Sequence, residues 1–280
     1  MEQFRCPNGL RVWSAPRTGR EIKFIFREIF EDRCYEQQGV SIGDGDVILD
    51  IGANVGLFAL SLMERFRDLK IFCLEPAPIT RGCLTRNLAE SPRRDLHQVK
   101  VLSDAVGADN ADAMITYFSR APGNSTLFPA EKHLDWDRII EDIGPAQVRR
   151  IHKGLGLLPR WLIRLITEAL MKPLLRDVVV QPCKVRPLSD VMAQLDLTRI
   201  DLLKIDVEGA EIDVLRGIAA PAWRRIRQLA MEVSPGHKGS LSELIGQLHA
   251  RGFRKVAAEG FAGGACMLDD PMPCMLYAVR

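Results

Sequence analysis

The sequence predicts an α/β protein built on a doubly wound, mostly parallel sheet of seven strands, with a helical lid insertion. Short apolar runs typical of buried strands alternate with segments whose apolar residues recur at helical spacing. The chain has 280 residues, of which 47% are hydrophobic and 26% charged. This size and composition suit a folded protein with a full hydrophobic core.

The predicted elements begin with an N-terminal cap of residues 1–45, containing a hairpin over 4–13 and a helix over about 21–30. Asn8 and Gly9 supply the tight turn of this hairpin. The main domain is expected over 46–280. Its first half places strands at 47–51, 70–74 and 99–103, with helices over about 55–66 and 79–90 between them.

The second half adds strands at 200–205, 228–233, 253–257 and 274–279, with helices over 211–216 and from 240 onward. The middle of the chain is expected to be irregular, with a lid or substrate insertion at about 119–177. A helix around Leu162 to Leu170 is expected inside it. Residues 149–176 carry seven Arg and Lys against one acid. An insertion of this length is typical of a lid or docking surface.

The composition disfavours several classes of protein. A net charge of +2 and 6% aromatic residues give no footprint for nucleic-acid binding. The seven cysteines form no C-x-x-C pair, which disfavours a zinc knuckle or disulfide framework. No apolar run reaches the ~18 residues of a membrane span. A cytoplasmic location without membrane contact is therefore expected.

The segment from Asp50 to Gly56 is the predicted ligand-binding loop, because it links a buried strand to a helix at the sheet edge where α/β folds bind ligands. Gly52 would allow a sharp turn, and Gly56 would allow close packing of the helix start. Asn54 tolerates the left-handed conformation. The loop departs from the G-x-G-x-x-G pattern of dinucleotide sites. The acid Asp50 suits a ligand with an ammonium or sulfonium charge.

The tips of the next two strands extend this site. Glu75, before Pro76, occupies the position from which an acid binds a ribose diol. Asp104, within Ser103-Asp104-Ala105, could accept a hydrogen bond from the amine of adenine. The amino acid, ribose and adenine parts of one ligand would each meet one strand tip, in chain order.

These blocks, together with Asp201 to Glu211, resemble those of the FkbM-type class I methyltransferases from about residue 40 to 255. The resemblance implies a Rossmann-like methyltransferase that transfers the methyl group of S-adenosylmethionine to a hydroxyl of a secondary metabolite. The cofactor-binding residues would be Asp50, Gly52, Ala53, Asn54, Gly56, Glu75, Pro76, Ser103, Asp104 and Ala105.

The segments Tyr117–Leu127 and Glu131–His133 are similar to members embedded in polyketide or peptide synthetases. The resemblance implies an acceptor carried on an acyl carrier protein, with neighbouring synthase domains as partners. A free small molecule is the alternative acceptor. Asn124, Ser125 and His237 are the expected substrate-binding residues.

An alcohol must lose its proton to accept a methyl group, so a base is required. We expect His133, Glu232 and Asp206 to line the acceptor side as catalytic residues, with His133 as the first candidate base and His237 as the second. Glu208 and Glu211 follow Asp206 closely. A Mg²⁺ ion on these carboxylates is a further option, but the sequence shows no clear third ligand, so no metal ligand is assigned. Lys204 is expected to pair with an acid.

Two alternative functions remain open from the sequence: an NAD-dependent oxidoreductase, and a non-catalytic docking module with a methyltransferase fold. The missing glycines disfavour the first. The intact loop residues disfavour the second, which a turnover assay would exclude.

Overall fold

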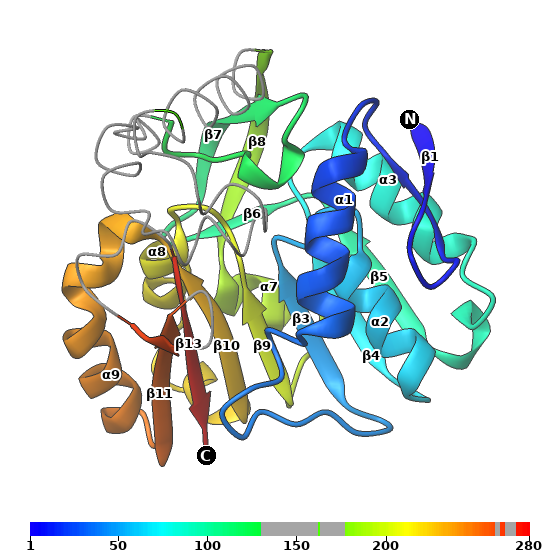
Figure 1. Ribbon diagram of the computed structural model, residues 1–280. Coiled ribbons are helices and arrows are strands. Elements are labelled where there is room, and N and C mark those ends of the chain that lie inside the picture. The colour runs from blue at the N-terminus through cyan, green and yellow to red at the C-terminus, as the bar shows by residue number, and fades with distance from the viewer. Residues whose placement is uncertain (130–161, 163–176, 261–263, 267–272) are drawn as a thin grey trace.

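The computed structural model of the chain describes residues 1–129, 162, 177–260, 264–266 and 273–280. The strands of its main sheet are β3 (Val47–Ile51), β4 (Lys70–Leu74), β5 (Gln98–Leu102), β9 (Leu202–Ile205), β10 (Gln228–Val233), β11 (Lys255–Gly260), β12 (Gly264–Ala265) and β13 (Cys274–Val279). They lie in the order β12-β11-β13-β10-β9-β3-β4-β5 (Figure 1). The strands from β10 to β5 are parallel, and β13 runs antiparallel to both of its neighbours. Apart from the two-residue β12, this is the predicted sheet, so the fold class is confirmed.

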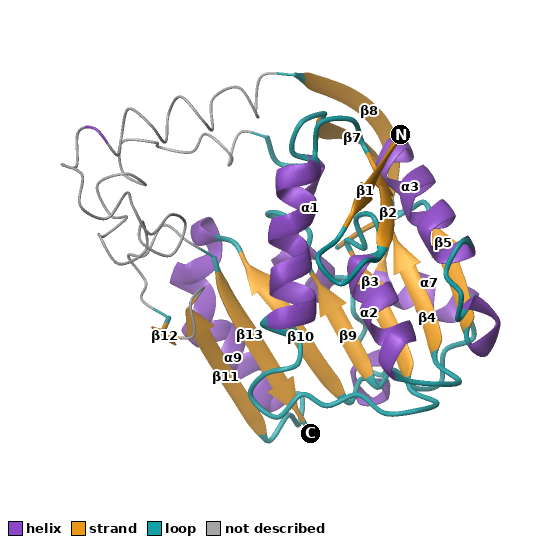
Figure 2. Cartoon of the chain, turned by 45° about the vertical axis from the view of Figure 1, so that its right-hand side comes forward, coloured by secondary structure: helices purple, strands orange, loops and turns teal. Residues whose placement is uncertain are grey.

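Helices cover both faces of this sheet. One face carries α1 (Gly19–Phe26), α2 (Leu57–Arg65) and α3 (Pro78–Ala89), and the other carries α7 (Leu188–Gln194), α8 (Glu211–Arg216) and α9 (Leu241–Ala250). Figure 2 shows α1 and α2 together in front of the strands. Successive residues of β3 alternate between the two faces: Ile48 packs with α1 to α3, and Leu49 packs with α7 to α9. Burial on both faces explains why β3 is apolar at every position except Asp50.

The sequence predicts an irregular middle of the chain. This prediction is wrong for the described residues on either side of the insertion, which form a separate sheet of three strands. Its strands are β6 (Ala105–Gly107), β7 (Ala111–Phe118) and β8 (Val178–Pro187), in the order β6-β8-β7. β7 and β8 are antiparallel neighbours although the insertion separates them in the sequence. The prediction missed β8 because Pro182 interrupts it and its outer residues Val178–Val180 are exposed. The predicted helix around Leu162 to Leu170 lies outside the described residues, apart from Leu162.

The N-terminal hairpin and helix are confirmed as β1 (Glu2–Arg5), β2 (Arg11–Ser14) and α1, which continues into the π-helical turn η1 (Arg27–Glu31). Short 3₁₀ turns are η2 (Arg94–Leu96), η3 (Pro122–Asn124), η5 (Ala222–Arg225) and η6 (Pro235–Ser240). Among the described residues, the helices are all too short or too polar to cross a bilayer.

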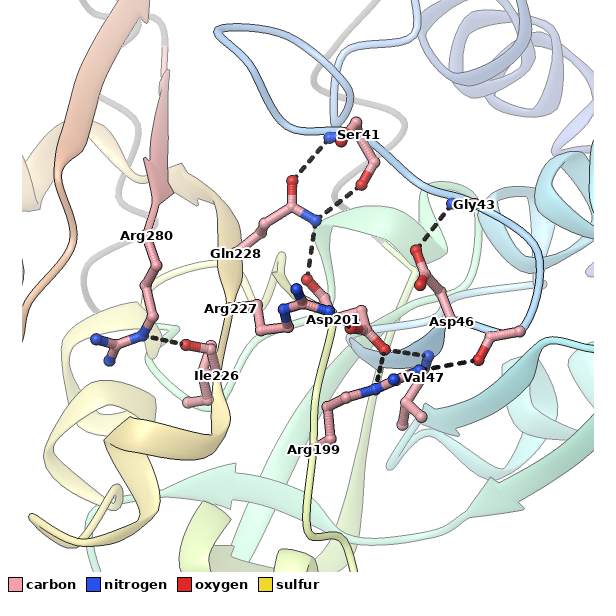
Figure 3. Close-up of polar contacts among 11 residues, drawn as sticks. Ser41, Gly43, Asp46, Val47, Arg199, Asp201, Ile226, Arg227, Gln228 and Arg280 are labelled. Atoms are coloured by element: carbon pink, nitrogen blue, oxygen red, sulfur yellow. Dashed lines mark hydrogen bonds and ion pairs between the residues drawn. The ribbon is translucent and has the colours of Figure 1, made fainter.

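A polar cluster closes the amino-terminal edge of the sheet, opposite the predicted ligand edge (Figure 3). Asp201, with its side chain 3% exposed, accepts a hydrogen bond from the Val47 amide at 2.9 Å and pairs with Arg199 and Arg227 at 2.8 and 3.0 Å. The Gln228 amide bonds both the N–H and the carbonyl of Ser41. These contacts fix the connection into β3 and thereby the register of the strand that carries the ligand loop.

Replacing Asp201 by Ala should lower the free energy of unfolding by about 1–3 kcal/mol, because the buried amide of Val47 loses its charged acceptor. The two arginines are exposed and can be hydrated in its absence. Urea denaturation measures the change, with the exposed Asp109→Ala as the matched control. Equal stability of the two variants would contradict the structural role of Asp201.

Candidate active site

The glycine loop between β3 and α2 has the backbone that the sequence predicts. Gly52 and Gly56 have φ values of +77° and +89°, and Asn54 has +49°, in the left-handed region. A Cβ atom on Gly52 would lie 1.8 Å from the Asp206 carbonyl oxygen, so no side chain fits there. The amides of Gly52 and Ala53 both donate to the Leu74 carbonyl at 3.0 Å. The loop is therefore fastened to the tips of β4 and β9.

A buried ion pair between β3 and β9 holds this loop in place. Asp50 is 0% exposed, and its Oδ1 lies 2.9 Å from Nζ of Lys204, whose side chain is 3% exposed. Lys204 also donates to the Gly52 carbonyl at 3.0 Å. Burial alone would lower the pKa of Lys204, but the carboxylates of Asp50 and Asp206 raise it above its ordinary value. The predicted pairing of Lys204 with an acid is confirmed. The Asp50 carboxylate positions the loop in this structure and is not presented to a ligand.

Glu75 connects the tip of β4 to the glycine loop. Its Oε2 accepts from the Asn54 amide at 3.0 Å, and its Oε1 accepts from the Ala77 amide at 2.9 Å. Burial raises the pKa of Glu75 to about 7, and these two amides oppose the shift. Arg81 donates to the carbonyls of Glu75 and Pro76 at 3.0 and 2.7 Å and so fixes the turn that follows.

These residues fit a nucleoside with a ribose diol. Each oxygen of a carboxylate has two lone pairs, so Glu75 retains acceptor capacity on both oxygens beyond its amide partners. The Oδ1 atom of Asn54 is buried and has no hydrogen-bond partner among the described residues. A buried amide oxygen without a donor is costly, and a ligand hydroxyl or ammonium would satisfy it.

The predicted adenine contacts Ser103 and Asp104 line two grooves of about 640 and 530 Å³, together with Arg81. Neither groove is lined by Glu75 or by the glycine loop. Asp104 lies 3.6 Å from Arg186 of β8. Ala105 is buried at the start of β6. The contact of these residues with adenine stays a prediction.

The segment 122–126 lies between the glycine loop and the tip of β9. The Gly123 amide donates to Glu21 of α1 at 2.8 Å, and a Cβ on Gly123 would lie 3.2 Å from the side-chain nitrogen Nδ2 of Asn54. At its other end, Thr126 Oγ1 donates to the Glu208 carbonyl at 2.6 Å. Asn124 and Ser125 thus stand beside the predicted cofactor loop, and substrate binding by them stays a prediction.

Three carboxylates converge beside this segment. Asp206, Glu208 and Glu232 each offer an oxygen within 4.8 Å of the others. We call these three residues the acid cluster. Asp206 and Glu232 are predicted site residues, and Glu208 is the third acid that the sequence did not single out as a ligand. Burial, and then the charges of Asp206 and Glu208, raise the pKa of Glu232 well above its ordinary value.

The N-terminal cap contributes to the same place, which sequence reasoning missed. Tyr35 donates from its hydroxyl to Asp206 at 2.8 Å. Glu28, on the π-helical turn η1, has its pKa raised to about 8 by burial and by the charges of Asp206, Asp32 and Glu208. A π-helical turn is frequent at functional sites. Tyr35 and Asp206 are 171 positions apart, and no local pattern links them.

The tip of β10 carries His237 within η6. Its Nδ1 lies 2.9 Å from Oε2 of Glu211, the first residue of α8. Glu211 is 1% exposed and also accepts from the Gly209 amide and the Ser234 hydroxyl, each at 2.8 Å. His133, the first candidate base from the sequence, lies outside the described residues.

Comparisons with known proteins place the chain in a family. The family model described as the methyltransferase FkbM domain matches residues 160–255. The chain is 32% identical over 267 residues to the 31-O-demethyl-FK506 methyltransferase FkbM of Streptomyces tacrolimicus, covering 94% of each chain. It is 34% identical over 212 residues to the methyltransferase sdnD of Sordaria araneosa, covering 76% of this chain and 74% of sdnD. It is also 32% identical to a segment of the antimetabolite synthetase AmbE of Pseudomonas aeruginosa, covering 85% of this chain and 11% of the synthetase.

Proposed function

Because the chain belongs to the FkbM family of methyltransferases, we propose that it transfers a methyl group from S-adenosylmethionine to a hydroxyl of a secondary metabolite. The observation that carries this proposal is the link between Glu75 and the glycine loop, at the edge where the acid cluster also lies. The relative from Streptomyces tacrolimicus is named for methylation at an oxygen, which supports oxygen as the acceptor atom.

Different residues would bind different parts of the donor. Glu75 would accept hydrogen bonds from the ribose diol, and Asn54 would accept one from a donor of the same nucleoside. Asp50 would act through Lys204, which holds the Gly52 carbonyl in place. When bound, S-adenosylmethionine supplies an activated methyl group. The enzyme then mainly orients donor and acceptor, which in well-aligned cases lowers a barrier by about 7–11 kcal/mol.

The acid cluster would serve the acceptor side. Its negative charge favours a cationic donor at this edge. The same three carboxylates are ligands of the type that Mg²⁺ prefers, and the ion would acidify a bound hydroxyl. The acid cluster thus acts either without a metal or by holding Mg²⁺. Methyl transfer measured with and without a chelator distinguishes these two options.

The form of the acceptor follows from a different observation. The segment of the synthetase AmbE that is similar to 85% of this chain makes up 11% of that synthetase. This supports an acceptor tethered to a carrier domain, with synthase domains as partners, rather than a free metabolite.

The proposal is tested by radiolabelled methyl transfer to carrier-bound β-hydroxyacyl groups, free sugars and catechols, with and without chelator. Transfer to one acceptor class is expected, and loss of transfer with the chelator would assign the metal. No transfer to any acceptor, with intact donor binding, would instead support the non-catalytic docking module. A thermal shift with NAD and none with S-adenosylhomocysteine would contradict the proposal altogether.

The affinity for S-adenosylhomocysteine, which the donor becomes after methyl transfer, should depend on pH through Glu75. Ribose hydroxyls prefer the carboxylate, so below the pKa of about 7 the proton on Glu75 competes with the ligand. Calorimetry should therefore show S-adenosylhomocysteine binding about tenfold more weakly at pH 6 than at pH 8. Glu75→Gln should bind weakly at both values, and the exposed Glu243→Gln should behave like the wild type. Equal wild-type affinity at the two pH values would contradict the role of Glu75.

A further inference from the structure

We propose that Asp206, held in place by Tyr35, binds the ammonium group in the amino-acid part of the donor. This inference rests on the proposed function and names the residue that recognises the cationic end of S-adenosylmethionine. The sequence favours Asp50 for that role and places Asp206 among the catalytic residues of the acceptor side. The structure buries Asp50 completely, so the cationic end of the donor needs another acid.

The order of the strands brings Asp206 next to the expected position of the amino-acid part. The strands β9, β3, β4 and β5 are neighbours in this order and run parallel, so their carboxyl ends meet at one edge. The chain order predicts adenine at the tip of β5, ribose at the tip of β4 and the amino-acid part at the tip of β3. The next tip along this line is that of β9, which Asp206 directly follows.

Asp206 also touches the glycine loop itself. Its amide donates to the Ile51 carbonyl at 3.0 Å, and its carbonyl oxygen would lie 1.8 Å from a Cβ on Gly52. The side chain of Asp206 is 28% exposed, whereas Asp50 is 0% exposed. A ligand on the glycine loop can therefore reach the carboxylate of Asp206 but not that of Asp50.

Tyr35 fixes the orientation of the Asp206 carboxylate. Its hydroxyl donates to Oδ2 at 2.8 Å, and Nζ of Lys204 lies 3.6 Å from the same oxygen. Burial, and then the charge of Asp206, raise the pKa of Tyr35 well above its ordinary value, so the hydroxyl keeps its proton and remains a donor. The ring of Tyr35 packs edge-on against that of Phe58 in α2, with the ring centroids 5.2 Å apart. Within the described part of the chain Oδ1 of Asp206 accepts no hydrogen bond, so it can accept one from an ammonium group.

The local charge favours a cation at this place. Lys204 is paired with Asp50 at 2.9 Å, so these two charges compensate each other. Asp206 therefore adds a negative charge beside the loop, and Glu208 and Glu232 of the acid cluster lie close to it. A hydrogen bond between an ammonium group and a carboxylate is roughly twice as strong as one between neutral groups. With Asp206 assigned to the donor, the other two carboxylates of the acid cluster are left for the acceptor.

The experiment compares the affinities of two ligands by calorimetry, with a chelator present so that no metal ion contributes. S-adenosylhomocysteine carries the amino-acid part, and 5′-methylthioadenosine has the same nucleoside and sulfur without it. Asp206→Asn removes the charge and keeps an acceptor for Tyr35, Tyr35→Phe removes only the hydroxyl, and the double variant combines them. Tyr277→Phe is the matched control, because the Tyr277 hydroxyl donates at 2.5 Å to the carbonyl of Cys34 in the same N-terminal cap. Circular dichroism checks the folding of each variant.

Asp206→Asn should bind S-adenosylhomocysteine about 10- to 100-fold more weakly, because a hydrogen bond between charged groups is lost. Its affinity for 5′-methylthioadenosine should change less than about threefold, because this ligand never made that bond. Tyr35→Phe should lose about 2- to 10-fold in affinity for S-adenosylhomocysteine alone. The double variant should bind no more weakly than Asp206→Asn, because Tyr35 acts through Asp206. Tyr277→Phe should bind both ligands as the wild type does.

The inference is overturned if a folded Asp206→Asn binds both ligands as the wild type does, or loses affinity for both equally. The role of Tyr35 is overturned if the losses of the two single variants add in the double variant, or if Tyr277→Phe weakens binding as much as Tyr35→Phe. If the wild type binds neither ligand, the proposed function fails and this inference fails with it. Failure of the inference alone differs from this, because the wild type then binds S-adenosylhomocysteine and the binding does not depend on Asp206.

Discussion

Replacing Lys204 by Met is expected to destabilise the protein by about 3–5 kcal/mol, because it leaves the Asp50 carboxylate buried without its cation. Asp50 is 0% exposed, so water cannot replace the lost ammonium. The Gly52 carbonyl loses its donor as well. Urea denaturation measures the loss, and Lys70→Met, at an exposed lysine of β4, should change stability by less than about 0.5 kcal/mol.

The double variant Asp50→Asn, Lys204→Met separates charge from packing. Removing both charges should recover a large part of the loss, because a buried pair replaced by neutral groups is often tolerated. If the single and double variants were equally unstable, the ion pair would not be the cause. If Lys204→Met were as stable as Lys70→Met, the structural account of the loop support would be wrong.

Replacing Gly52 by Ala should abolish measurable binding of S-adenosylhomocysteine, because the new Cβ would lie 1.8 Å from the Asp206 carbonyl oxygen. The loop or the β9 tip must move, and both form the site. The left-handed backbone at φ +77° adds a cost of order 1–3 kcal/mol. Calorimetry and urea denaturation together measure the two effects.

Gly45 provides a matched control. Its φ of +78° is nearly that of Gly52, but a Cβ there meets no atom within 4 Å. Gly45→Ala should therefore show the backbone cost alone and bind the ligand normally. Equal binding by the two variants would contradict the close approach of the glycine loop to the tip of β9.

The fold could be predicted because its strands carry strong local signals. β3 is buried on both faces and is apolar at every position except Asp50, and Asn54 and the loop glycines mark the turn after it. β7 and β8 were missed because each pairs with a distant segment and neither alternates cleanly between buried and exposed residues. Pairing between distant segments leaves no local pattern.

The candidate site, like the fold, could be predicted only where a local sequence pattern marks its residues. Glu75, Asp206 and Glu232 stand at strand tips, so the topology alone brings them to one edge. Tyr35 and Glu28 come from the N-terminal cap, and only tertiary packing carries them to Asp206. Burial of Asp50 could not be read from the sequence either, because its pairing with Lys204 depends on the register of β3 and β9. Sequence therefore located the edge, and packing decided which side chains face it.

The most direct measurement is a crystal structure of the protein grown with S-adenosylhomocysteine. The account predicts the nucleoside at the edge formed by β3, β4 and β9, with both ribose hydroxyls within hydrogen-bond distance of Glu75. Density for the nucleoside in another place, or none at a saturating concentration, would contradict it.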